Sequence, residues 1–408
     1  MRPVTTAADL RRFVALPYRL HRGDPLWVPP LRMDVRTMLS RKKNPFFQHS
    51  EAVYFLAESH GAVIEHGARG AEHGEAGGGP RAISHALGAG TAGPTSAALI
   101  WRDGVVGRIA AIHNRAHNEF HGDRVGFFGF FECVNDQAIA NALFAAAASW
   151  LRQRGLDTMR GPTSFSTNDE CGLLVEGIDT PPTVLNPHNP PYYVDLVAGA
   201  GFTKAKDLWQ FQSTTNELPE RLVRAARLVA ERKKLTLRQL DMKRFDHEVE
   251  LIKYIYNQAW ERNWGFVPMT DAEVDHLARQ LKPVVVPELV CFVEREGETV
   301  GFAAALPDLN VALKRNPSGR LFPGIVRILW AARKITRIRI LLLGLLKEYR
   351  MTGADALMYH WIWDKGYAKG YRWAEAGWIL EDNPAIVNGM LRIGFEHYKT
   401  LRLYERPL

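Results

Sequence analysis

Acidic and imidazole side chains gather in two polar stretches of the chain. Asn168, Asp169 and Glu170 directly precede Cys171, and His188 lies in a second stretch rich in Asn and Pro. Carboxylates and imidazoles can take a proton from an attacking nucleophile. We therefore expect Glu170 or His188 to act as a general base, with Asn168 and Asp169 beside it. Turn formation by Asn168 and Asp169 is the structural alternative.

Two tyrosines follow the second stretch. Tyr192 and Tyr193 carry phenol groups, which can give a proton to a departing group. Packing in the core is their structural alternative. Cys171 has no histidine at a local spacing that marks a nucleophilic pair, so we expect proton transfer rather than covalent catalysis.

A third stretch has the pattern of a phosphate-binding turn. An apolar run over 338–346 predicts a buried strand, and Leu357, Met358, Trp361 and Ile362 predict a helix after it. The unpaired N–H groups of a helix N-terminus bind phosphate oxygens, and a glycine lets the backbone approach them closely. The residues expected at this site are Leu345, Leu346, Arg350, Met351, Thr352, Gly353, Ala354, Asp355 and Asn383.

This turn resembles the coenzyme A loop of the GNAT acyltransferase superfamily, Arg/Gln-x-x-Gly-x-Gly/Ala. Arg350 and Gly353 match the first two landmarks, whereas Asp355 stands where the family has glycine or alanine. Many GNAT enzymes have a tyrosine acid where this chain has Met390, so that role does not carry over. The resemblance implies an acyl-coenzyme A (acyl-CoA) donor and direct transfer of the acyl group to an amine acceptor.

The chain repeats one pattern. The Asn-Pro pair at 189–190 recurs at 383–384, and the Gly-Phe pair at 201–202 recurs at 394–395, at nearly the same spacing. Strands and helices alternate around both copies, which implies α/β sheets. We therefore expect an α/β (α+β) fold of two tandem GNAT-like units, each a central mixed sheet flanked by helices.

The two units are expected to have different tasks. Residues 1–212 form the N-terminal, acceptor-side unit, with a flexible insertion over about 60–95. Residues 213–246 form a charged connector, and residues 247–408 form the C-terminal unit with the acyl-CoA loop. The corresponding stretch of the first unit, 132–136, has no glycine and holds two carboxylates that would repel phosphate. One donor site per chain is therefore expected.

Composition narrows the class of protein. Hydrophobic residues make up 46% and charged residues 24%, which argues against global disorder. The formal charge of +8 suits a phosphate-bearing ligand or an anionic membrane, but no recognition helix or aromatic–basic sheet motif marks a nucleic-acid partner. Three widely spaced cysteines, and no apolar run of about 18 residues, predict a cytoplasmic protein without a transmembrane helix. His113, His117 and His121 have polar neighbours that favour a solvated turn, so no metal is expected.

Residues 320–339 predict a basic amphipathic helix. Phe322, Ile325, Leu329 and Ala332 follow helical spacing, and basic residues lie off that stripe. Such a helix can lie in a lipid headgroup layer, and packing on its own domain is the alternative. The lipid interpretation predicts peripheral contact with the inner face of the membrane.

The family resemblance extends to a bacterial group of tandem GNAT-like proteins linked to N-acylation of sphingoid bases. It implies a long-chain acyl group and a lipid-like amine acceptor. Two other functions stay open: a small-molecule N-acetyltransferase, and a non-catalytic acyl-CoA sensor. Met390 in place of the usual acid would suit the sensor.

Overall fold

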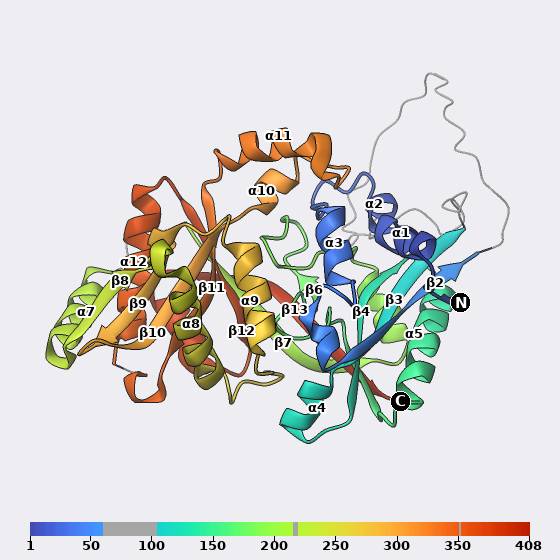
Figure 1. The fold of residues 1–408 in the computed structure, drawn as a ribbon, viewed down its shortest axis with the longest axis horizontal. Coiled ribbons are helices and arrows are strands. Elements are labelled where there is room, and N and C mark those ends of the chain that lie inside the picture. Colours follow the sequence, from blue (N-terminus) through green and yellow to red (C-terminus); the bar gives the residue numbers. More distant parts are fainter. Residues whose placement is uncertain (60–103, 215–218, 351) are drawn as a thin grey trace, which may run out of the picture.

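A computed structural model describes residues 1–59, 104–214, 219–350 and 352–408. The insertion expected over about 60–95 and Met351 therefore lie outside the described residues. We call residues 1–213 the first half and residues 220–408 the second half. The two halves lie side by side in Figure 1, with the first half (blue to green) on the right.

The strands of the first half are β1 (Arg2–Pro3), β2 (Glu51–Glu58), β3 (Val105–His113), β4 (Val125–Cys133), β5 (Thr158–Gly161), β6 (Leu173–Glu176) and β7 (Thr203–Ser213). Its helices are α1 (Ala7–Ala15), α2 (Pro17–Leu20), α3 (Arg32–Met38), α4 (Arg115–His121), α5 (Gln137–Arg152) and α6 (Tyr193–Gly199).

The strands of the second half are β8 (Leu235–Gln239), β9 (Val290–Arg295), β10 (Glu298–Pro307), β11 (Arg337–Leu345), β12 (Trp373–Leu380) and β13 (Glu396–Pro407). Its helices are α7 (Glu220–Lys233), α8 (Phe245–Ala259), α9 (Asp271–Leu281), α10 (Asn310–Leu313), α11 (Leu321–Ala332), α12 (Ala354–Ala368) and α13 (Pro384–Arg392).

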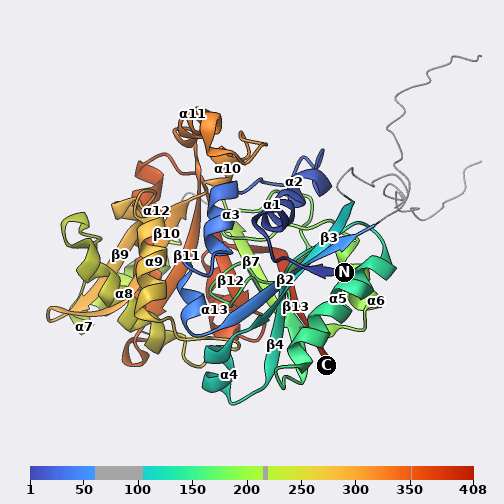
Figure 2. The same cartoon turned by 45° about the vertical axis from the view of Figure 1, so that its right-hand side comes forward.

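Within the described residues the strands form one 13-stranded sheet, in the order β1-β2-β3-β4-β5-β13-β7-β12-β11-β10-β9-β8, with β6 paired to β13. β4 is parallel to β5, and β11 is parallel to β12. The other pairs of named strands are antiparallel. This mixed sheet with its flanking helices confirms the predicted fold class (Figure 2).

The two halves exchange their last strands. β13 of the second half pairs with β5 of the first, and β7 of the first half pairs with β12 of the second. β7 and β13 also pair with each other along the middle of the sheet, where Arg402 of β13 binds both carboxylate oxygens of Asp207 of β7 at 2.7 and 2.9 Å. In Figure 1 the red β13 accordingly runs from the centre into the first half. Each half thus completes the sheet of the other.

The helix predicted after the apolar run 338–346 is confirmed as α12, and α5 connects the parallel strands of the first half in the same way. Asp136 caps α5 by accepting hydrogen bonds from the N–H groups of Ala138 and Ile139, and Leu143 and Leu151 of this helix are buried in the core. α12 buries Leu357, Met358 and Ile362 against a second core cluster. The apolar spacing of each helix therefore sets the face that packs on the sheet.

The segment 320–339 is only partly helical, which corrects the sequence interpretation. α11 ends at Ala332, and Arg339 belongs to β11, where it is buried. No helix in the described ranges combines the length and the apolar character needed to cross a bilayer.

The strand exchange predicts that both halves unfold together. Phe211 of β7 is fully buried in the core of the second half, so Phe211→Ala should lower the free energy of unfolding by about 3–5 kcal/mol. Denaturation followed by circular dichroism, by tryptophan fluorescence and by calorimetry should give one coincident transition that shifts as a whole. Two transitions, with only one displaced, would show that the halves are independent.

Candidate functional site

The parallel strands of the second half separate toward their carboxyl ends. β11 and β12 pair only as far as Ile340 and Ala376, although both strands continue beyond those residues. Past the last pair, Leu341 of β11 and Gly377 and Trp378 of β12 are partly exposed, even though these strands lie inside the sheet. The strands therefore part beyond Ile340 and Ala376, and residues at this separation reach solvent; we call this separation the cleft.

A buried polar network lies where the strands part. Glu375 is 0% exposed, and Arg339 Nε lies 3.2 Å from its Oε1. The same oxygen accepts hydrogen bonds from Thr183 Oγ1 at 2.5 Å and from Asn186 Nδ2 at 2.7 Å, and Tyr398 donates to the other oxygen. The buried carboxylate is thus paired and hydrogen-bonded, the condition under which such a charge is tolerated.

Arg339 also ties this network to both sides of the cleft. It donates to Gly377 O of β12 at 3.1 Å and to Val184 O in the first half. Val184 N in turn donates to Asp308 Oδ1 at 2.9 Å. The segment that contains Thr183 and Asn186 is therefore fixed over the point where the strands part.

A second loop of the first half reaches the second half. Thr167 Oγ1 donates to Gly265 O at 2.6 Å, Asn168 Nδ2 donates to Val267 O at 3.2 Å, and Tyr256 of α8 donates to Asn168 Oδ1 at 2.6 Å. The structure thus places Asn168 as an anchor between the halves, and its side chain is occupied by these bonds.

Asp169 and Glu170 follow that anchor and differ in their partners. Both side chains reach solvent, yet the surrounding protein desolvates them. Desolvation raises the pKa of Asp169 to about 7, and Ser166 Oγ donates to this carboxylate at 3.1 Å. Desolvation also raises the pKa of Glu170, while Arg339 and Arg108 oppose the shift. The backbone carbonyl of Glu170 accepts from Ser164 N at 2.9 Å, whereas its carboxylate makes no hydrogen bond or ion pair within the described chain.

His188, Tyr192 and Tyr193 are held by other groups of the first half. His188 Nε2 lies 2.7 Å from Asp24 Oδ2, and burial lowers the pKa of the imidazole. Tyr192 donates to Cys133 O at 2.9 Å, and Tyr193 donates to Glu132 Oε2 at 2.6 Å. Burial raises the pKa of both phenols, so neither is readily ionised.

The predicted phosphate-binding turn follows β11. Gly353 has a φ of 77° and occupies the N-cap of α12, and none of the described side chains caps this helix. The N–H groups of its first turn are therefore available to an anion. Gly353 also lies beside Ala226 of α7. Asp355 is exposed in that first turn and does not act as a cap.

The remaining residues predicted for the turn are placed as follows. Arg350 donates to Leu345 O at 3.3 Å and to Ala259 O at 2.8 Å, and Thr352 Oγ1 donates to Tyr349 O at 2.6 Å. Leu345 and Ala354 are buried, and Leu346 is partly buried. Asn383 caps α13 by accepting from Ile386 N at 3.3 Å. Arg350 therefore braces the turn against α8, and the helix N-terminus remains the group that fits a phosphate.

The corresponding region of the first half is closed. The carboxylate of Asp136 occupies the N-terminus of α5, the position that an anion would need. A Cβ atom on Gly129 of β4 would lie 2.1 Å from Thr163 O, so the loop after β5 packs directly on β4. The two halves therefore share a topology but differ at the end of the parallel pair.

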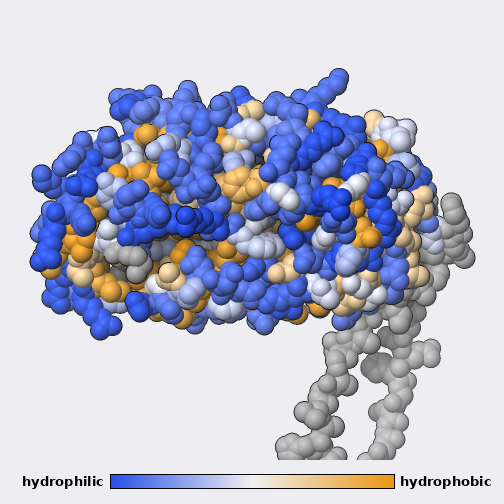
Figure 3. Space-filling model, turned by 90° about the horizontal axis from the view of Figure 1, so that it is seen from below, coloured by the Kyte–Doolittle hydropathy of each residue, from blue (hydrophilic) through white to orange (hydrophobic). Residues whose placement is uncertain are grey.

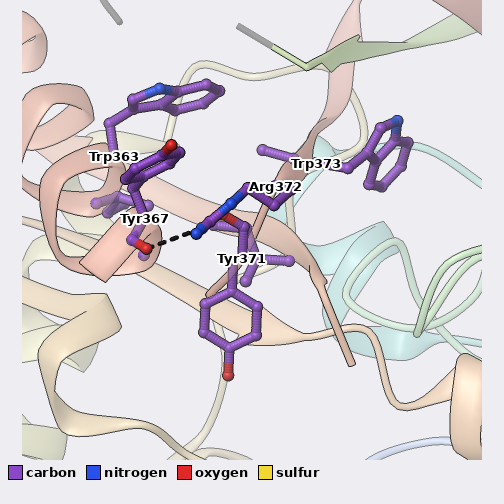
Figure 4. A pocket seen from close by; sticks show the side chains of 9 residues that line it. Trp363, Tyr367, Tyr371, Arg372 and Trp373 are labelled. Carbon is purple, nitrogen blue, oxygen red and sulfur yellow. Dashed lines mark hydrogen bonds between the residues drawn. The ribbon is translucent and has the colours of Figure 1, made fainter. Parts of the chain in front are cut away.

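The described residues give little support for metal-dependent or cysteine-based catalysis. No group of three or more His, Cys, Asp or Glu side chains there is arranged to hold a metal ion. Burial raises the pKa of the Cys171 thiol to about 12, which keeps it protonated. A cavity of about 20 Å³, lined by Trp363, Tyr367 and Trp373 among others (Figure 4), lies where β11 and β12 begin, at the opposite end from the cleft. It has room for about one water molecule.

Sequence reasoning missed the residues of the buried polar network where β11 and β12 part. Arg339 lies inside an apolar run, and Glu375 lies between two alanines of a buried strand. A charge within an otherwise apolar strand is the signal that could have marked them, because an unpaired buried charge is unfavourable. Thr183, Asn186 and Tyr398 carry no comparable signal in the sequence.

Asp169 gives the site a testable pH dependence. Because its folded pKa is raised to about 7, the folded state holds a proton that the unfolded state releases from about pH 4 upward, and stability is lost as pH rises through this window. Asp169→Asn removes this cost and can still accept from Ser166. Its melting temperature should exceed that of the parent by more at pH 8 than at pH 5. A constant difference across this range would contradict the prediction.

Comparison with known proteins identifies relatives over the whole chain. The chain is 36% identical over 422 residues to the bacterial ceramide synthase of Caulobacter vibrioides, with 100% of this chain and 97% of the relative covered. It is 32% identical over 409 residues to protein YghO of Escherichia coli, with 98% and 93% covered. No protein-family model matches the chain.

Solved structures with the same fold are tandem or GCN5-related acetyltransferases. A tandem GNAT protein from the clavulanic acid biosynthesis pathway aligns with a TM-score of 0.53 at 12% identity, over 100% of this chain and 98% of that one. A GCN5-related glucosamine N-acetyltransferase region of a fungal enzyme aligns with a TM-score of 0.52 at 10% identity, over 99% of this chain and 38% of that one. The fold is therefore that of tandem GNAT proteins, and the chain is an acyltransferase that belongs to the family of the bacterial ceramide synthase.

Proposed function

We propose that this protein is an acyl-CoA-dependent N-acyltransferase that transfers a long-chain acyl group to a lipid-like amine. The observation that carries the proposal is the N-terminus of α12, which no described side chain caps and which follows the separating strand β11 after the short 3-10 helix Lys347–Tyr349. By contrast, Asp136 caps α5. The ceramide synthase name of a relative supports a lipid-like amine acceptor.

In this proposal the donor and the acceptor approach the cleft from opposite ends. The N–H groups of α12 after Gly353 would hold the pyrophosphate, and the opening between β11 and β12 would admit the thioester. The acceptor would lie against the loops of the first half that carry Thr183 and Glu170. Asp355 adds a carboxylate near the phosphates, so the donor site relies on backbone groups and not on net positive charge.

Glu170 is the proposed general base. Its raised pKa and its lack of a partner suit a carboxylate that takes a proton from the acceptor amine. The amine nitrogen then forms a bond to the thioester carbonyl carbon, and the carbon–sulfur bond breaks. The proton taken from the amine ends on the departing thiolate, so the products are an amide and a free thiol. His188, Tyr192 and Tyr193 have partners within the first half, and we give them no proton-transfer role here.

A charge placed at the N-cap of α12 tests the donor site. Gly353→Asp should weaken coenzyme A binding about tenfold or more, because a carboxylate near the phosphates costs on the order of 1–3 kcal/mol. Gly353→Asn is the matched control, since both residues tolerate a positive φ and only one is charged. Calorimetric titration with coenzyme A measures the affinity of both variants. Equal affinities for the two variants would mean that the phosphates bind elsewhere.

Removing the proposed base tests the acceptor side. Glu170→Gln should lower kcat by about 100- to 10,000-fold and leave coenzyme A affinity unchanged. Glu119→Gln, an exposed change on α4, is the control and should keep full activity. Turnover is measured with acyl-CoAs of graded length and with long-chain and small polar amines. A preference for acetyl-CoA and small amines would favour the N-acetyltransferase alternative, and binding without any turnover by the parent would favour a sensor.

A further inference from the structure

α11 exposes an unusually apolar face. Phe322, Val326, Leu329 and Trp330 are 75%, 70%, 59% and 58% exposed. Val326, Leu329 and Trp330 are spaced to share one side of the helix, and Phe322 lies at the kink near its start. α11 projects from the rest of the molecule at the top of Figure 1 and Figure 2. The opposite face of the molecule is mostly hydrophilic, with apolar side chains in smaller patches (Figure 3). A contiguous exposed patch of large apolar side chains marks an interaction surface.

The segment that carries this apolar face is rich in basic residues. The segment 309–334 contains no Asp or Glu, and its basic residues are Lys314, Arg315, Arg320, Arg327, Arg333 and Lys334. All six are exposed, and none forms an ion pair in the described part of the chain. The ammonium group of Lys334 lies 3.9 Å from the ring centroid of Trp330. Exposed apolar and aromatic side chains in a segment rich in cations without ion pairs match the boundary between acyl chains and anionic headgroups.

Helix α11 is linked, through α10, to the buried polar network where β11 and β12 part. α10 packs against α11, and Asn310 of α10 donates to Pro182 O at 3.0 Å. The following residues Thr183 and Asn186 bind Glu375, and between them Leu185 is 42% exposed with a φ of 63°. A non-glycine residue in this conformation persists only where its surroundings hold it. The loop that contains Thr183 and Asn186 is therefore held next to α10, on which the exposed helix α11 packs.

From these observations we infer that α11 docks on an anionic lipid bilayer, with Phe322, Val326, Leu329 and Trp330 inserted among the acyl chains and the basic residues on the headgroups. A second copy of the chain does not fit this face as well. A symmetric contact would bring the same unpaired cations together without any carboxylate to neutralise them. Docking on a bilayer goes beyond the proposed reaction and does not depend on it.

Vesicle flotation without substrate tests the docking. The parent should float with vesicles of phosphatidylcholine containing about one third phosphatidylglycerol, and only weakly with phosphatidylcholine alone. Phe322→Ser/Trp330→Ser should lower binding to the anionic vesicles about tenfold or more, because two large apolar groups no longer insert. Arg327→Gln/Arg333→Gln should remove most of the preference for anionic lipid.

Leu228→Ser/Tyr254→Ser is the matched control, because both residues are similarly exposed but lie on α7 and α8. This variant should bind like the parent, and far-ultraviolet circular dichroism should show all variants folded. Equal binding by the parent and the Phe322→Ser/Trp330→Ser variant would overturn the inference. So would a native mass that shows a dimer of the parent which this variant dissolves, without any vesicle binding. Because flotation needs no turnover, its result is separate from that of the acyl-transfer assays.

Discussion

The antiparallel pairing of β7 with β13 is the constraint on which the rest of the structure depends. It joins the two halves along the middle of the sheet, and it places the last strand of each half beside the parallel strands of the other. Because β7 lies against β12, the position of β12 relative to β11 is set partly by the first half. The cleft in the second half is therefore a property of the whole chain.

The two halves share one topology but differ in the structure that follows their parallel strands. In the second half the parallel strands separate and the following helix begins without a side-chain cap. In the first half a carboxylate caps that helix, and the loop after β5 folds against β4 and continues to Glu170, whose pKa is influenced by Arg339 of β11. The first half thus has a capped helix where the second half has an open one, and its loop after β5 contacts the second half through Asn168. Asn168, Thr183 and Asn186 are among the residues through which the first half contacts the second.

The sequence was sufficient for local features and for the fold class. The apolar run over 338–346 and the helical spacing after it predicted β11 and α12, because burial and period act within a few residues. The exchange of β7 and β13 was not predictable, since an apolar strand carries no mark of which neighbour it will take. The roles of Asp169, Glu170 and the turn at Gly353 stay predictions. Arg339 was assigned to a surface helix because its basic neighbours suggested one, and only the pairing with Glu375 explains a buried arginine there.

The order in which the chain is synthesised gives the exchanged strands a further consequence. β5 and β7 leave the ribosome early, but β13, which lies between them, belongs to the second half and is synthesised after the other named strands. During translation the edges of β5 and β7 stay unpaired until the strands of the second half have been synthesised. Exposed edges of this kind recruit other strands, so the nascent first half is the stage at which the protein is most open to misassembly and most dependent on chaperones.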